Sequence, residues 1–238
     1  MAVPEPVPEH HHRNVQGGAA RAAVFGVSDG LVSNVGLVLG VAGSSAAPSF
    51  VRLAGLISLV SGAFSMAAGE YLSMTAQTEL LERELEMERT EIRRNPQSER
   101  QELAAIYSSR GLDPAMAEQL ATEMMRDPEL ALEAHAREEL GIDPGQLGSP
   151  MGAAASSFFA FALGAVIPLL PWFLAQGAAA TVASVVVGVM AAVAIGVALG
   201  VVTARSPLRP AVRQLVVAGA AAAVGYVLGS LMGGTTPT

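Results

Sequence analysis

Two stretches of this chain contain no charged residue. The first covers the 61 residues between Asp143 and Arg205, and the second covers the 25 residues that follow Arg213. A membrane-spanning helix needs about 20 consecutive apolar residues, so the first stretch has room for two spans and the second for one. Pro168 and Pro171 mark the break between the first two. A soluble domain does not leave so much sequence uncharged, and we therefore expect an integral membrane protein.

Two further apolar segments, residues 22–43 and 50–74, bring the expected number of spans to five. The sequence thus predicts an all-α membrane protein. Five of the six arginines outside the acidic segment described below lie on one side of the predicted spans, namely Arg13, Arg21, Arg205, Arg209 and Arg213, and Arg52 is the exception. By the positive-inside rule this side faces the cytoplasm. We expect a cytoplasmic N-terminus, an outside C-terminus, no cleaved signal peptide and a place in the cell (inner) membrane.

An insert between the second and third spans, residues 76–148, carries the negative charge of the chain. It contains 17 Asp and Glu residues against 8 Arg, a net charge of −9, while the whole chain carries −7. Helix starts are recognised by Asp, Asn or Ser followed by Pro, and helix ends by Gly. The starts are Asn95-Pro96, Asp113-Pro114, Asp127-Pro128 and Ser149-Pro150, and the ends are Gly111 and Gly141. We predict that the second span continues to residue 94 and that the insert is a compact cytoplasmic helical bundle.

The expected organisation has five parts. They are a polar N-terminal tail (1–21), spans 1 and 2 (22–75), the acidic metal-binding domain (76–148), spans 3 to 5 (149–233) and a C-terminal tail (234–238). Glycines four residues apart would let membrane helices approach closely. These pairs are Gly26/Gly30, Gly36/Gly40, Gly196/Gly200 and Gly225/Gly229. Cysteine is absent, which excludes disulfides and thiolate metal ligands.

Six side chains of the insert have the spacing of a metal site. Two pairs of glutamates lie three residues apart on either side of the Asn95-Pro96 turn, and a histidine and a glutamate lie four apart near residue 140. These candidate ligands are Glu88, Glu91, Glu99, Glu102, His135 and Glu139. Two antiparallel helices joined by the short turn would bring the four carboxylates together. Carboxylates with an imidazole suit Mn²⁺ or Fe²⁺, with Zn²⁺ also acceptable. The alternative is a solvated, ion-paired helix face.

The membrane segments hold a second set of candidate residues. Asp29 is the single charge of residues 22–43 and lies about 10 Å deep, where a carboxylate usually serves ion or proton traffic. Met66, Glu70 and Met74 form one stripe of the second span, with Met66 about 12 Å deep. We predict a transport path through Asp29, Met66 and Glu70. The alternatives are an aspartate that reaches water and a methionine that only fills a packing gap.

These residues carry a resemblance to the vacuolar iron transporter family, whose members are proton-coupled exporters of Fe²⁺ or Mn²⁺ from the cytosol. The matching segments are SDGLVSNVGLVLG at 28–40, SGAFSMAAGEYLS at 61–73 and HAREELG at 135–141. The chain resembles a prokaryotic-type member from about residue 14 to residue 233. The separation of 37 residues between Asp29 and Met66 also fits the family pattern.

The resemblance implies a homodimer of five-helix protomers, with the metal path between the two copies of spans 1 and 2. It assigns the path to Asp29, Met66 and Glu70, and it assigns metal binding in the insert to Glu88, Glu91, Glu99, Glu102 and Glu139. The chain departs from the family at His135-Ala136, where a methionine pair is expected, and histidine would change metal preference or pH sensitivity. The implied protein is not an enzyme, and its partners are divalent metal ions, protons and the lipid bilayer, with no cofactor and no nucleic acid.

Two other functions fit parts of this pattern. A membrane-anchored metal sensor or buffer would use the insert alone, with the spans as an anchor. An amino-acid or lipid transporter has no support beyond hydropathy. The first alternative differs from a transporter in one respect, since it gives Asp29 and Met66 no role.

Overall fold

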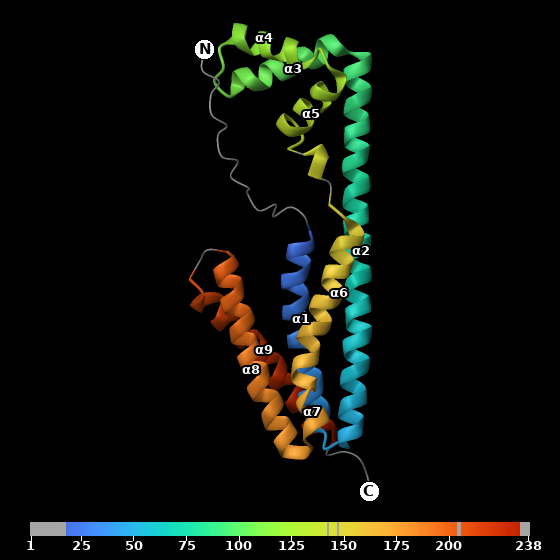
Figure 1. The fold of residues 1–238 in the computed structure, drawn as a ribbon, viewed down its shortest axis with the longest axis vertical. Coiled ribbons are helices and arrows are strands. Elements are labelled where there is room, and N and C mark those ends of the chain that lie inside the picture. The colour runs from blue at the N-terminus through green and yellow to red at the C-terminus, as the bar shows by residue number, and fades with distance from the viewer. Residues whose placement is uncertain (1–17, 142, 147, 204–205, 234–238) are drawn as a thin grey trace, which may run out of the picture.

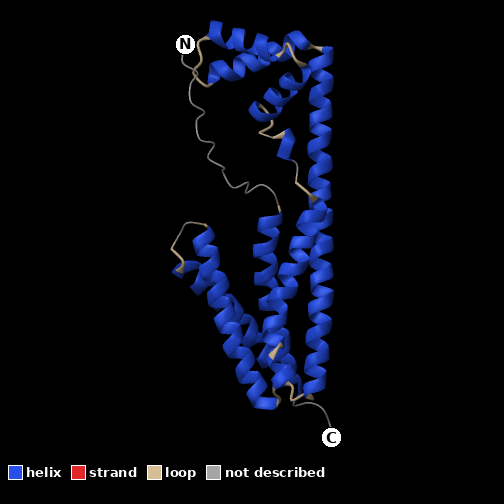
Figure 2. Cartoon of the chain, viewed as in Figure 1, coloured by secondary structure: helices blue, strands red, loops and turns tan. Residues whose placement is uncertain are grey.

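The structure, a computed structural model, describes residues 18–141, 143–146, 148–203 and 206–233. All regular elements in these ranges are helices, so the all-α prediction is confirmed (Figure 2). Most of the predicted N-terminal tail, the C-terminal tail and the two arginines Arg13 and Arg205 lie outside the described residues.

The predicted number of membrane spans is confirmed, because five helices are long and apolar enough to cross a bilayer. They are α1 (Ala19–Gly43), α2 (Pro48–Arg94), α6 (Pro150–Leu169), α8 (Gly177–Val202) and α9 (Leu208–Gly233). The short helix α7 (Pro171–Leu174) fills the predicted break between the third and fourth spans. Helix α1 lies at the centre of the bundle, in contact with the other four spans (Figure 1).

Glycines set how closely α1 packs on its neighbours. A methyl group on Gly30 would lie 2.1 Å from the carbonyl oxygen of Phe161 in α6, and one on Gly164 would lie 2.2 Å from that of Val27. Helices α1 and α9 also approach too closely for side chains at their crossing, where the facing glycines are Gly36, Gly40, Gly225 and Gly229. Three of the predicted glycine pairs therefore lie at the crossings of α1, as expected for helices held by close backbone contact in a bilayer.

Helix α2 is 47 residues long, about 70 Å, and joins the membrane bundle to the insert (Figure 1). Helices α3 (Pro96–Ser109), α4 (Pro114–Met124) and α5 (Pro128–Glu138) and the 3-10 turn η1 (Pro144–Gln146) pack around its far end. The side chains of Asp113, Asp127 and Ser149 accept hydrogen bonds from backbone N–H groups of the helices they precede. Gly111 and Gly141 have positive φ angles of 98° and 66°, which ends the preceding helices as predicted.

The predicted antiparallel arrangement of α2 and α3 is wrong. Helix α3 runs crosswise to α2 and lies beside α4 (Figure 1). Its apolar residues Leu103 and Ala104 pack with Ala121 of α4 and Ala134 of α5 instead of folding back along α2. The sharp turn at Asn95 still brings the start of α3 next to the end of α2. The four predicted glutamates lie within about two helical turns of Asn95, so they remain close to one another.

Candidate metal centre

The six predicted ligands gather where α2, α3 and α5 meet. Helix α2 carries Glu88 and Glu91, α3 carries Glu99 and Glu102, and His135 and Glu139 lie at the end of α5. Apolar contacts position α5 from two sides. Ala131, Leu132 and Ala136 pack on Leu85 and Ile92 of α2, and Ala134 packs on α3 and α4. The apolar residues on either side of His135 thus fix the direction of its ring.

Glu88 is shared by two groups of possible metal ligands. One group is Glu88, His135 and Glu139, and the other is Glu88, Glu91 and Glu99; within each group the ligand atoms lie within 4.8 Å of one another. His135 Nδ1 is 3.1 Å from Glu88 Oε1 and 3.6 Å from Glu139 Oε2. Glu102 is exposed and belongs to neither group, but its charge acts on both Glu88 and Glu99.

The centre of the cluster is buried, and three of its polar atoms lack a hydrogen-bond partner in the described part of the chain. His135 is fully buried, and Glu88 and Glu99 are 5% and 7% exposed. Among the described residues, neither ring nitrogen of His135 nor Oε1 of Glu88 has a hydrogen-bond partner, since the 3.1 Å contact lacks hydrogen-bond geometry. Burying a polar group without a partner costs roughly 1–3 kcal/mol, and a divalent cation held by these atoms would remove that cost. The imidazole and the carboxylates are ligand types that Fe²⁺ and Mn²⁺ accept.

The carboxyl groups also respond to burial and to one another. The pKa of Glu88 is raised from 4.5 to about 7, mainly by burial and then by the charges of Glu139, Glu99, Glu91 and Glu102 in that order. Burial likewise raises the pKa of Glu99, with Glu102 as the next cause. Each of these groups therefore favours a proton or a cation over a bare negative charge.

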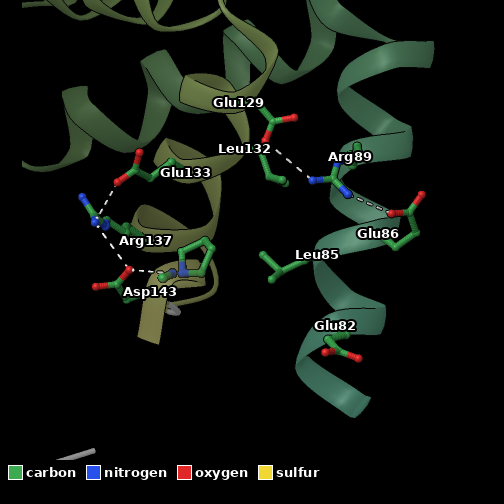
Figure 3. Close-up of a pocket in the computed structure, with 11 residues that line it drawn as sticks. Glu82, Leu85, Glu86, Arg89, Glu129, Leu132, Glu133, Arg137 and Asp143 are labelled. Atoms are coloured by element: carbon green, nitrogen blue, oxygen red, sulfur yellow. Dashed lines mark hydrogen bonds and ion pairs between the residues drawn. The ribbon is translucent and has the colours of Figure 1, made fainter. Parts of the chain in front are cut away.

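Most other acids of the insert are paired with arginine. A cavity of about 630 Å³ between α2, α5 and η1 shows this arrangement (Figure 3). In it Arg89 contacts Glu86 and Glu129, and Arg137 contacts Glu133 and Asp143. Elsewhere the pairs are Arg100–Glu118, Arg110–Glu138 and Arg126–Glu123. The alternative of an ion-paired face is thus correct for these acids, whereas no arginine pairs with the cluster around Glu88 in the described part of the chain.

The three predicted path residues have separate partners in the structure. Asp29 accepts a hydrogen bond of 3.3 Å from Ser33, one turn further along α1. Met66 packs with the cluster of Ala63, Phe161 and Ala165 between α2 and α6. Asp29 and Glu70 are not joined by a hydrogen bond in the described part of the chain.

The partner of Glu70 was not predicted. Arg21 Nη2 at the start of α1 lies 2.5 Å from Glu70 Oε1, whose side chain is only 11% exposed. The signal that could have revealed this pair was present, because the two charges lie at the same end of neighbouring spans. The structure thus places a positive side chain on a carboxylate of the predicted path.

Comparison with known proteins identifies the family. The sequence pattern described as the VIT family matches residues 20–230, which is most of the chain. The chain belongs to the VIT family. It is 32% identical over 227 residues to vacuolar iron transporter 1 of Arabidopsis thaliana, covering 94% of this chain and 91% of the relative. It is 31% identical over 221 residues to vacuolar iron transporter 1 of Oryza sativa subsp. japonica, covering 91% and 88%.

Another relative matches a shorter part of the chain with a higher sequence identity. The vacuolar iron transporter of Acanthamoeba castellanii is 40% identical over 161 residues, which cover 67% of this chain and 58% of that protein. The resemblance derived from the sequence motifs is therefore confirmed. As a VIT-family member with five candidate spans, the chain is an integral membrane protein of a transporter family.

Proposed function

We propose that this VIT-family protein exports Fe²⁺ or Mn²⁺ from the cytoplasm in exchange for protons. The observation that carries the proposal is the buried cluster in which His135, whose ring nitrogens accept or donate no hydrogen bond among the described residues, adjoins Glu88 and Glu139. This cluster has the donor set of a site for a divalent metal ion. It lies on a helix that continues into the membrane, which supports transport beyond metal binding alone. The names of the relatives agree with an iron cargo.

Helix α2 provides a direct connection between the insert and the membrane path. Glu88 and Glu70 are 18 residues apart, which is five helical turns, so they lie on the same side of α2 about 27 Å apart. A metal ion released from the cluster would reach Glu70 along this side of the helix. Arg21 holds Glu70 before the metal arrives, and the ion would have to displace it.

Asp29 is the proposed exchange group within the membrane. A carboxylate in a low-dielectric region holds either a proton or a metal ion, and this alternation couples the two fluxes. In the single chain Asp29 is half-buried and Ser33 is exposed. A second copy of the chain would cover this face of α1, together with the exposed apolar residues of α2 such as Phe64 and Val60. We therefore propose a homodimer in which Asp29 and Met66 of both copies line one path.

The proposed orientation places the insert in the cytoplasm. The insert then collects metal on the side from which it is exported, and the arginines at the same end of the bundle agree with this orientation. The relatives named above are vacuolar iron transporters, so an internal membrane is an alternative to the cell (inner) membrane.

A flux assay in liposomes tests the proposal. Wild-type protein should carry Fe²⁺ and Mn²⁺ at a rate that rises when a pH gradient is imposed, and Asp29→Asn should abolish this flux. Glu99→Gln/Glu102→Gln should reduce flux at low metal and leave it nearly unchanged at saturating metal, because the path is intact. A wild-type flux that ignores the pH gradient would refute proton coupling.

A membrane-anchored sensor or buffer remains the second candidate, favoured by the same buried cluster. It predicts the opposite ranking of variants. Loss of the Glu88 cluster would then abolish metal tolerance in cells, and Asp29→Asn would leave it unchanged.

A further inference from the structure

The end of the bundle next to the insert has a cavity whose lining differs from that of the cavity in Figure 3. It lies between α8 and α9 and has a volume of about 940 Å³. Its described lining is Leu199, Thr203, Ser206, Arg209, Pro210 and Arg213, with no acidic side chain among them. The cavity of Figure 3, in contrast, has five carboxylates beside its two arginines. The α8–α9 cavity is therefore a basic site with apolar and hydroxyl walls.

The two arginines are free to bind an anion. Arg209 and Arg213 are four residues apart on α9, so they lie on the same side of the helix, one turn from each other. Neither forms an ion pair with any described residue, whereas five of the eight arginines of the insert do. Two guanidinium groups that face one cavity without a carboxylate suit a phosphate group, which accepts paired N–H donors from arginine.

The walls of the cavity are held in place by close backbone contacts between α8 and the start of α9. A methyl group on Gly200 would lie 2.5 Å from Cα of Pro207, and one on Gly196 would lie 2.3 Å from Cα of Ala211. The backbone of α8 is thus in contact with Pro207 and Ala211, which lie on either side of Arg209 in the sequence. Two helices fixed in this way keep their relative position when a ligand enters or leaves.

The cavity also lies at a membrane surface. Arg209 and Arg213 occupy the first turns of α9, and the chain has no charged residue after Arg213. The α8–α9 connection is at the same end of the bundle as the insert (Figure 1), which is the arginine-rich side of the spans. Headgroups of anionic lipids are concentrated at such cytoplasmic surfaces, and basic pockets between membrane helices bind them.

We infer that the α8–α9 cavity binds the phosphate of an anionic phospholipid, with Arg209 and Arg213 as the two cationic contacts. The apolar wall at Leu199 and the exposed side chains of α8 beyond it, such as Val201, would accompany the glycerol and acyl chain. The site is separate from the metal cluster; it rests on the cytoplasmic orientation proposed above and does not depend on metal transport.

Native mass spectrometry of the full-length protein with an equal mixture of phosphatidylglycerol and phosphatidylcholine tests this inference. Wild-type protein should retain phosphatidylglycerol in preference. Each arginine near an anionic surface contributes a factor of about five, so Arg209→Gln/Arg213→Gln should lower the preference about 25-fold. Arg93→Gln/Arg94→Gln is the matched control, since it removes the same charge from exposed positions at the far end of α2 that form no ion pair with a described residue, and it should keep the wild-type preference.

Three further results decide between explanations. Arg209→Lys/Arg213→Lys should retain only part of the preference if the guanidinium fork matters, and it serves as the test variant if the glutamine pair does not fold. Equal retention of the two lipids by wild type, or an unchanged preference in the glutamine pair, would overturn the inference. Displacement of phosphatidylglycerol by millimolar inorganic phosphate would identify a site for free phosphate and would also overturn it.

Discussion

Replacing Glu88 by glutamine should change the stability of the metal-free insert in a pH-dependent way. Glu88 is 5% exposed and lies beside four other carboxylates, and its pKa is raised from 4.5 to about 7. A carboxyl group whose pKa is raised by folding is held protonated in the native state while the unfolded chain has already released its proton. Its contribution to stability is therefore intact below pH 4.5 and is lost as the pH rises towards 7.

The size of this effect follows from the shift. One pKa unit corresponds to about 1.4 kcal/mol, so a shift from 4.5 to about 7 costs about 3 kcal/mol at pH 8. At pH 5.5 only the first unit of the shift has been lost, about 1.4 kcal/mol. Between these two pH values the metal-free insert should lose about 2 kcal/mol of stability. Glu88→Gln removes the ionisation and with it most of this loss, leaving the smaller contribution of Glu99.

Hydrogen exchange of the α5 amides in the full-length, chelator-treated protein measures this loss, after correction for the intrinsic effect of pH on exchange. The opening free energy of these amides should fall by about 2 kcal/mol from pH 5.5 to pH 8 in wild type and much less in Glu88→Gln. Glu82→Gln, at an exposed position of the same helix, should behave like wild type. If Glu88→Gln retains the full pH dependence, Glu88 is not the group responsible.

Other predictions concern metal binding, the path and the packing of α1. Mn²⁺ should stabilise α5 in wild type at pH 8 and much less in Glu88→Gln, as hydrogen exchange will show, because the variant lacks the ligand shared by both groups. Arg21→Gln should raise the apparent metal affinity in flux assays at the membrane, since it frees Glu70 from its 2.5 Å ion pair; an unchanged affinity would mean that the pair plays no part in metal entry. Gly30→Ala should lower the thermal stability of the membrane bundle, because its methyl group would lie 2.1 Å from a carbonyl oxygen of α6. Gly69→Ala is its control, with no atom within 4 Å of the new methyl group, and equal melting temperatures would contradict the packing argument.

The sequence alone determined the elements of this protein and their order. Charge-free stretches predicted three spans and apolar segments two more, because hydrocarbon excludes charge, and the Asp-Pro and Ser-Pro starts predicted helices at the residues where they begin. Spacing along the helices selected the five side chains that lie together around Glu88, and it also selected Glu102, which belongs to neither group. These signals are local, since each depends on a few consecutive residues and on the geometry of a single helix.

Only the tertiary structure decided how those elements meet. It turned α3 crosswise to α2, placed Met66 against α6 and paired Arg21 with Glu70. It also distinguished the buried cluster around His135 and Glu88, which no arginine contacts among the described residues, from acids elsewhere in the insert that are neutralised by arginine. The reason is that burial and pairing depend on which surfaces of distant segments fit together, and similar glutamates and glycines occur along the whole chain. Helical periodicity states which side chains share a face, but packing between helices decides what that face contacts.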